Sequence, residues 1–322
     1  MITELRGFSA LSVMLFHFVC VSNNYLKSEF LMDVFDYGKL GVQVFFIISG
    51  FILFDSLFKS EYRLKNMPAF ILKRIIRIEP PYILSLVLII FIAFIKFSLF
   101  EHGNGNEITL TVNQIISHLG YVIPFTHFNW LSIVYWTLAI EFQFYFLLAI
   151  LFPLFSKKYS VYANICFLIT CIILSNQLPE VELFKWFPIF LLGIMKAQFD
   201  HKVLTIRDYV ISLGIVLTMI FYTLDITTFI VGTLVTMVLN INKELKLNSL
   251  RFLGKISYSL YLFHTIIGFL LINVCLKISD NYVFRFSSFI LISSVVIWIS
   301  YLINNYVEIP FKKIASNIKF KN

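Results

Sequence analysis

The sequence predicts an all-α protein that crosses a membrane about ten times, with both termini in the cytoplasm. Hydrophobic residues make up 59% of the 322 residues and charged residues only 14%. Apolar runs long enough to cross a bilayer recur along the chain, and a soluble core cannot bury so much apolar side chain. The composition therefore excludes a soluble globular protein.

Ten apolar runs are expected to form the membrane-spanning helices. A helix rises 1.5 Å per residue, so about 20 residues cross a hydrocarbon core of ~30 Å. The third run is longer than this and begins with polar residues. The predicted spans are 5–22, 39–58, 70–100, 133–154, 161–177, 183–198, 207–222, 226–241, 256–277 and 284–307.

The basic residues orient these spans. Most of the 26 Lys and Arg fall at alternate ends of the spans, in 59–77, 157–158, 196–207, 243–255 and 312–321. Because cytoplasmic loops are enriched in Lys and Arg, these ends are assigned to the cytoplasm. The same placement accounts for the net charge of +8 without a nucleic-acid partner.

The first span carries an arginine and a histidine on one face. Arg6 and His17 are eleven residues apart, which is three turns plus roughly 20° and a rise of roughly 16 Å. An ionisable group near the bilayer midplane is costly, ~2.5–3.5 kcal/mol for a charge, and by default suggests function. The alternative is an anchoring arginine and a histidine that bonds a neighbouring helix.

The second span is expected to pack closely against its neighbours. Gly41, Ser49 and Gly50 are small residues that let helix backbones approach each other.

Two arginines mark the start of the third span. Arg74 and Arg77 are three residues apart, so they project from one face of a helix. Paired guanidinium groups suit phosphate recognition, whereas the alternative is ordinary anchoring at the cytoplasmic surface. Pro80-Pro81 is expected to break or kink the helix after them.

The outer segment 101–132 contains no Lys or Arg. Within it, Val112–Phe125 is apolar but too short to span, so we expect a re-entrant or interfacial piece. His118 and His127 in this segment either line an external cleft or simply belong to a polar loop, and the second interpretation is favoured.

The fourth span carries a buried acid. Glu141 is ~12 Å below the outer surface and His17 ~18 Å from the inner one, so both can reach one level. A carboxylate that bonds one imidazole nitrogen fixes the tautomer and makes the other nitrogen a better base. The alternative is a hydrogen bond between helices without chemistry.

Later spans add one polar stripe. Ser257, Tyr261 and His264 share one face of the ninth span. Spans five to eight carry no chemical motif, and their glycines are expected to be packing points. The four cysteines form no C-x-x-C pair, so neither disulfides nor metal ligands are expected. The glycines are Gly193, Gly214 and Gly232, and the cysteines are Cys20, Cys166, Cys171 and Cys275.

Together these motifs resemble the acyltransferase 3 family of membrane O-acyltransferases. The resemblance covers the whole chain, in order. It rests on Arg-(ten residues)-His at Arg6 and His17, and on Arg-x-x-Arg at Arg74 and Arg77. It also rests on four further stretches: Gly-Val-x-x-Phe-Phe-x-x-Ser-Gly-Phe from Gly41, Trp-x-Leu-x-x-Glu ending at Glu141, Ser-Tyr-x-x-Tyr-Leu-x-His ending at His264, and Glu-x-Pro-Phe from Glu308. Glu79 departs from the family pattern.

The resemblance implies transfer of an acyl group, usually acetyl, from cytosolic acyl-CoA to a hydroxyl of an envelope glycan. Such an acceptor is a polysaccharide or a lipid-linked glycan such as the O-antigen of lipopolysaccharide, at the bacterial cytoplasmic (inner) membrane. We expect residues 1–322 to form one membrane-embedded domain without a fused SGNH esterase-like domain. Expected partners are acyl-CoA, the carbohydrate and membrane lipid, without nucleic acid or a metal.

The roles of the site residues follow from the same resemblance. Arg6, Arg74 and Arg77 are expected to bind the coenzyme, and His17, Glu141, His264 and Tyr261 are the catalytic candidates. His17 would either deprotonate the acceptor or carry the acyl group transiently. The main alternative is a proton-coupled transporter or glycolipid flippase that uses the buried His and Glu as a proton relay. It lacks visible inverted repeats.

Overall fold

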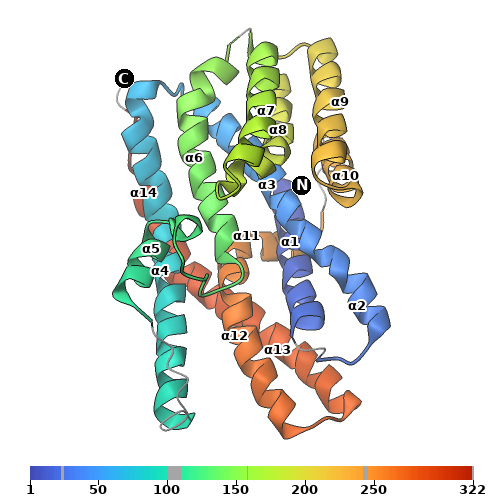
Figure 1. Cartoon of the computed structure of the whole chain (residues 1–322). Helices are drawn as coiled ribbons and strands as arrows, with labels where there is room; N and C mark the ends of the chain where they lie inside the picture. The colour runs from blue at the N-terminus through green and yellow to red at the C-terminus, as the bar shows by residue number, and fades with distance from the viewer. Residues whose placement is uncertain (23–24, 101–109, 158, 242–245, 321–322) are drawn as a thin grey trace.

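The fold is a bundle of helices (Figure 1), and no strand occurs among the residues that the computed structural model describes, which are 1–22, 25–100, 110–157, 159–241 and 246–320. Every predicted span is helical. The long helices are α1 (Ile2–Phe16), α3 (Gly41–Lys59), α4 (Met67–Phe100), α6 (Tyr135–Phe155), α7 (Ser160–Gln177), α8 (Glu182–Asp200), α9 (Ile206–Thr223), α10 (Ile226–Asn240), α12 (Ser257–Ile278) and α13 (Tyr282–Ile303).

Short helices connect and flank the long ones. The short α-helices are α2 (Glu29–Asp36), α5 (Val112–Leu119), α11 (Asn248–Lys255) and α14 (Ile309–Ser316). Two π-helical turns, η1 (His17–Val21) and η5 (Asn304–Glu308), extend α1 and α13, and the 3₁₀ turns are η2 (Tyr37–Leu40), η3 (Leu64–Asn66) and η4 (Ile123–Phe125).

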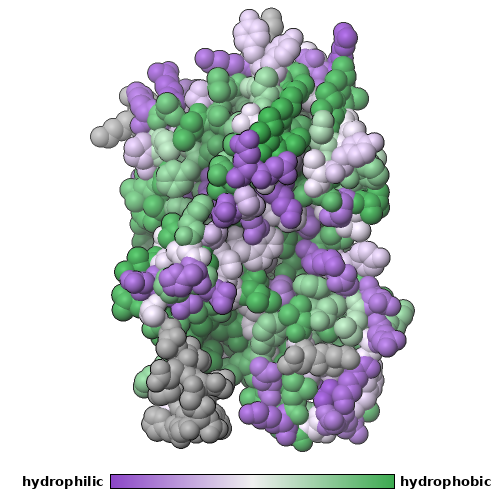
Figure 2. Space-filling view, in the orientation of Figure 1, coloured by the Kyte–Doolittle hydropathy of each residue, from purple (hydrophilic) through white to green (hydrophobic). Residues whose placement is uncertain are grey.

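Within the described part of the chain, eight helical segments are long and apolar enough to cross a membrane. The two predicted spans outside this set are α8 and α10. α10 is apolar but only 15 residues long. α8 has sufficient length but carries Glu182, Lys185 and Lys196. Figure 2 shows broad hydrophobic areas on the side of the bundle, as expected of a surface that faces lipid.

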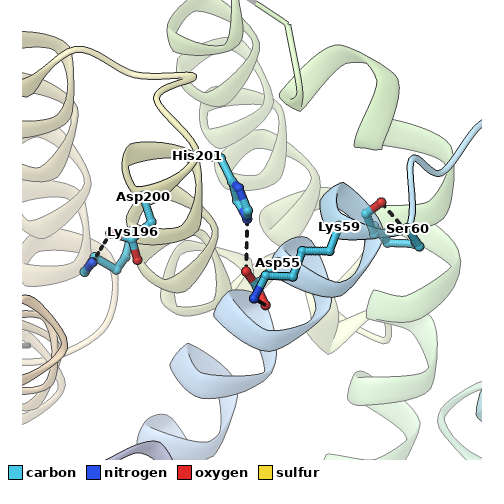
Figure 3. Close-up of polar contacts among 7 residues, drawn as sticks. Asp55, Lys59, Ser60, Lys196, Asp200 and His201 are labelled. Carbon is cyan, nitrogen blue, oxygen red and sulfur yellow. Dashed lines mark hydrogen bonds and ion pairs between the residues drawn. The ribbon is translucent and has the colours of Figure 1, made fainter.

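Three contacts between helix ends agree with the predicted sidedness, whereas Gly41, at the predicted outer end of its span, packs on Ser9 near the inner end of α1. On the predicted cytoplasmic side, the Arg251 guanidinium bonds Glu4, and the His201 imidazole lies 2.9 Å from the Asp55 carboxylate (Figure 3). On the opposite side, Lys27 pairs with Asp280. Each of the three contacts joins segments that the charge pattern assigns to one side of the membrane.

Helices α3 and α8 cross at two glycines. A Cβ on Gly193 would lie 1.9 Å from the carbonyl oxygen of Ile47, and one on Gly50 would lie 2.1 Å from that of Phe190. These glycines therefore set the close approach of the two backbones, as small residues do in membrane bundles. The expectation for Gly214 is wrong, because no atom lies within 4 Å of its Cβ position.

The prolines in α4 do not break the helix. α4 continues through Pro80 and Pro81, although each proline removes one backbone hydrogen bond. In the same turn, the Tyr258 hydroxyl of α12 donates to the carbonyl oxygen of Ile78 at 2.8 Å. This bond ties α12 to α4 beside the site described below.

The outer segment folds back into the bundle. The carbonyl oxygen of His118 in α5 accepts a hydrogen bond from Tyr82, which lies in the middle of α4. Tyr121 stacks on Tyr82 with ring centroids 5.1 Å apart and is 4% exposed. The piece predicted within 112–125 thus contacts α4 through His118 and Tyr121, while the side chains of Val112, Ile116 and Phe125 remain exposed.

His118 holds this segment together. Its Nδ1 donates to the carbonyl oxygen of Gln114, and its Nε2 accepts the backbone N–H of Leu131 at 3.0 Å. Burial lowers the pKa of His118, so the neutral form that these two bonds require is favoured. His118 therefore has a structural role within the loop.

Candidate functional site

A cavity with about 900 Å³ of empty space, partly open to solvent, lies where five long helices and η5 meet. It combines a wall from α3 that is apolar except for Ser49 with polar groups from α1, α4, α6, α12 and η5. Its polar lining residues are Arg6, Ser49, Arg74, Arg77, Thr137, Glu141, Tyr145, Ser257, Tyr258, Tyr261 and Glu308.

Three arginines converge on this cavity. Arg6 comes from α1, while Arg74 and Arg77 come from one face of α4. Arg77 is close enough to repel both of the other guanidinium groups. Among the described residues, none of the three forms an ion pair. The lining therefore concentrates positive charge that the protein leaves unpaired.

Arg74 is held by aromatic rings. Its guanidinium carbon lies 5.2 Å from the ring centroid of Phe70 and 5.6 Å from that of Tyr145. Cation–π contacts of this kind fix a guanidinium without neutralising it. Its Nε is buried and has no hydrogen-bond partner among the described residues, so one N–H donor is free for a ligand.

Both carboxylates of the cavity accept hydrogen bonds from serine hydroxyls. Oε1 of Glu141 accepts a hydrogen bond from the Ser49 hydroxyl at 2.9 Å. Glu308 is 1% exposed, pairs with Lys312 at 2.5 Å and accepts from Ser259 at 2.7 Å. Lys312 offsets the charge of Glu308, so the cavity keeps its positive excess and favours an anion.

A pair of histidines lies beyond the cavity. Nε2 of His264 is 3.0 Å from Nδ1 of His17, and His264 is fully buried. Nδ1 of His264 faces the carbonyl oxygens of Leu260 at 3.1 Å and Tyr261 at 2.9 Å. Because both are acceptors, His264 carries its proton on Nδ1 and has a lone pair on Nε2.

This arrangement also fixes the tautomer of His17. Its Nδ1 faces two acceptors, Nε2 of His264 and the carbonyl oxygen of Val13 at 2.9 Å, so this nitrogen carries the proton. The lone pair of neutral His17 is therefore on Nε2. A histidine held in this way presents one defined basic nitrogen.

The predicted bond between Glu141 and His17 is wrong. In the described structure Glu141 bonds Ser49 and lines the arginine cavity, whereas the imidazole of His17 bonds Val13 and His264. Glu141 shares the cavity with Arg6, eleven residues before His17, so the expectation that Glu141 and His17 reach one level is not met. The orienting partner of His17 is His264.

Tyr261 connects the cavity with the histidine pair. Its ring centroid is 5.9 Å from that of His264, and it also lines the cavity. The Thr137 hydroxyl donates to the carbonyl oxygen of Val134, so the Tyr261 hydroxyl, 2.8 Å from Thr137 Oγ1, is the donor in their contact. This proton is therefore already used within the protein.

The structure thus sorts the predicted site residues into two groups. Arg6, Arg74, Arg77 and Glu141 meet in the cavity, His17 and His264 form the pair beyond it, and Tyr261 borders both. Sequence reasoning left out the roles of Ser49 and Tyr145. Ser49 had been assigned to packing alone. Tyr145 follows Glu141 by one helical turn, and that spacing could have identified it.

Two residues of the site, His17 and Glu308, lie at the ends of π-helical turns. η1 begins at His17 and η5 ends at Glu308. A π turn inserts one residue into a helix and frequently occurs at functional sites.

Comparison with known proteins agrees with this geometry. The family model described as an acyltransferase domain, that of the acyltransferase 3 family, matches residues 4–305. Neither the curated proteins nor the solved structures contain a match.

Proposed function

Because this chain belongs to the acyltransferase 3 family, we propose that its transferase reaction moves an acetyl group from cytosolic acetyl-CoA to a hydroxyl of an envelope glycan. Family membership and the apolar helices support a multi-pass membrane acyltransferase. The proposal adds the donor, the acceptor class and the bacterial inner membrane as the location.

The observation that carries the proposal is the group of three arginines without ion-pair partners among the described residues. Coenzyme A carries several phosphate charges, and guanidinium groups bind phosphate through paired N–H donors. The free Nε of Arg74 supplies one such donor inside the cavity. Arg6, Arg74 and Arg77 also lie at the predicted cytoplasmic side, where acyl-CoA is available.

The proposed chemistry uses His17. The bound donor supplies a thioester, and its acyl carbon must lie near the acceptor hydroxyl. The helical rise separates Arg6 from His17 by roughly 16 Å, so a donor held by the arginines must extend toward the midplane. Nε2 of His17 takes the hydroxyl proton while the hydroxyl oxygen bonds the acyl carbon, the carbon–sulfur bond breaks, and the proton passes to the departing coenzyme A thiolate. Alternatively, Nε2 attacks the acyl carbon first, coenzyme A leaves, and the hydroxyl then takes the acyl group from His17. In both routes His264 keeps the ring in its tautomer.

The acceptor is proposed to be a polysaccharide or lipid-linked glycan such as the O-antigen of lipopolysaccharide. It must approach His17 from the outer side, opposite the arginines. In this scheme Glu141, bonded to Ser49, lies in the donor cavity beside the arginines. Tyr261 lies between that cavity and the histidine pair.

Binding of acetyl-CoA by the purified protein tests the proposal. The wild-type protein in neutral nanodiscs should bind acetyl-CoA, and the Arg74→Ala, Arg77→Ala double variant should bind it much more weakly. A proton-coupled transporter or a glycolipid flippase should not bind acetyl-CoA. Absence of binding by a folded wild-type protein would therefore contradict the proposed donor.

A further inference from the structure

The first residue of α12 presents an unused donor to the arginine cavity. Ser257 lines the cavity and is 0% exposed. Its hydroxyl has no hydrogen-bond partner among the described residues. A buried hydroxyl without a hydrogen-bond partner is destabilising, so this group calls for an explanation.

The amino end of α12 adds backbone donors at the same place. α12 is 22 residues long, and no side chain caps its start. The first backbone bond that enters its first turn comes from Leu260 N–H to the Ile256 carbonyl. In the described structure, the N–H groups of residues 257–259 therefore lack backbone acceptors, as is general for a helix start. A helix start of this kind favours negative charge.

The two sources of positive potential meet in one cavity. Arg6, Arg74 and Arg77 line it together with Ser257 and Tyr258. Glu308, the last residue of η5, is paired with Lys312 and accepts a hydrogen bond from Ser259. Neither the hydroxyl nor the arginines are satisfied by this carboxylate.

We infer that the Ser257 hydroxyl and the first-turn N–H groups of α12 bind a phosphate group between the three arginines. The inference rests on the proposed function and assigns this phosphate to the acyl donor. Two parts of α12 then have different roles. Its start binds the donor, and His264, two turns later, orients His17.

Three variants test the inference by equilibrium binding of coenzyme A. Ser257→Ala removes one hydrogen bond to a charged group, so binding should weaken about 10-fold. Ser257→Asp places a carboxylate among the arginines, so binding should fall below detection while thermal stability is kept. Ser212→Ala is the matched control, because Ser212 in α9 is also buried and its hydroxyl is also unpartnered among the described residues.

The choice of probe distinguishes a phosphate site from other contacts. Ser257→Ala should weaken binding of coenzyme A and of inorganic pyrophosphate, and should leave binding of pantetheine, which has no phosphate, unchanged. Coenzyme A affinity should be equal in neutral phosphatidylcholine and anionic phosphatidylglycerol nanodiscs. Competition by the anionic lipid would assign the site to a headgroup phosphate and overturn the donor assignment.

The result that would overturn the inference is separate from the one that would overturn the proposed function. If wild-type protein and both Ser257 variants bind coenzyme A equally, while the Arg74 and Arg77 variants do not, the inference fails and the proposed donor stands. If the folded wild-type protein does not bind coenzyme A, the proposed donor fails.

Discussion

The arginine cavity and the histidine pair satisfy their polar groups in opposite ways. In the cavity, three guanidinium groups lack ion-pair partners among the described residues and Arg74 Nε lacks an acceptor. At the histidine pair, three of the four ring nitrogens have hydrogen-bond partners within the protein. Unpaired positive charge is suited to binding an anion, whereas a fixed tautomer with one basic nitrogen is suited to proton transfer.

This comparison predicts that variants of the two regions change different quantities. Variants of the cavity should change donor affinity, and variants of the histidine pair should change the rate. A single region that served both purposes would give variants in which affinity and rate fall together.

The largest effect is expected at His17. His17→Ala removes the only basic nitrogen that the pair presents, so acetylation of the envelope glycan should fall by ~10²–10⁴-fold. Coenzyme A affinity should remain unchanged, because His17 does not line the cavity. Mass spectrometry of the glycan from cells, beside coenzyme binding by the purified variant, measures both. Near-normal acetylation in a folded His17→Ala protein would contradict the proposed chemistry.

A smaller loss of rate is expected at His264, which acts through His17 as a positioning residue. His264→Gln retains polarity but does not hold His17 in one tautomer, so the acyl-transfer rate should fall by roughly 10²-fold. The pH dependence of the rate should also change, whereas KM for the donor should not. If the pH dependence of the acyl-transfer rate did not change, His264 would contribute only to packing.

The arginine variants should lose affinity. Arg74→Ala and Arg77→Ala should each weaken coenzyme A binding by ~1.5–3 kcal/mol, the range for hydrogen bonds to charged groups. Lysine at either position should restore only part of it, because lysine lacks the guanidinium fork. Isothermal titration measures this directly. Full affinity in the double alanine variant would indicate that both arginines only anchor the helix at the cytoplasmic surface of the membrane.

The smallest effect concerns His118, which lies outside both regions. Because burial lowers the pKa of His118 below its ordinary value of about 6.5, the unfolded segment binds a proton more readily than the folded one. The stability that His118 contributes is therefore present above that value and is lost as the pH falls below it. The protection factors of amides in 112–131, which are corrected for the intrinsic exchange rate at each pH, should fall from pH 7.5 to 5.5, and His118→Gln should reduce that dependence.

The sequence predicted the helices well and their arrangement relative to one another poorly. Apolar runs mark the helices, and the α-helical repeat places Arg74 and Arg77 on one face, so both could be predicted. They do not determine which helices face each other. Glu141 and His17 were therefore paired wrongly.

The partner of His17 illustrates the same limit. His264 was expected on a polar stripe, yet its contact with His17 depends on how α1 and α12 pack. Gly268 contributes to this packing, because a Cβ there would lie 2.2 Å from the ring of Phe18, next to His17. No periodicity within one helix contains that information.

The π turn that begins at His17 changes the direction in which the residues after it project from the axis of the first helix. Residues before it follow the α-helical repeat that places Arg6 and His17 on one face, and the inserted residue offsets everything after it by about 100°. The direction of the His17 imidazole and the direction of the chain after the π turn, toward the outer side, can therefore vary independently. Loss of one residue between Phe18 and Val21 would turn the outward connection while leaving the imidazole in place.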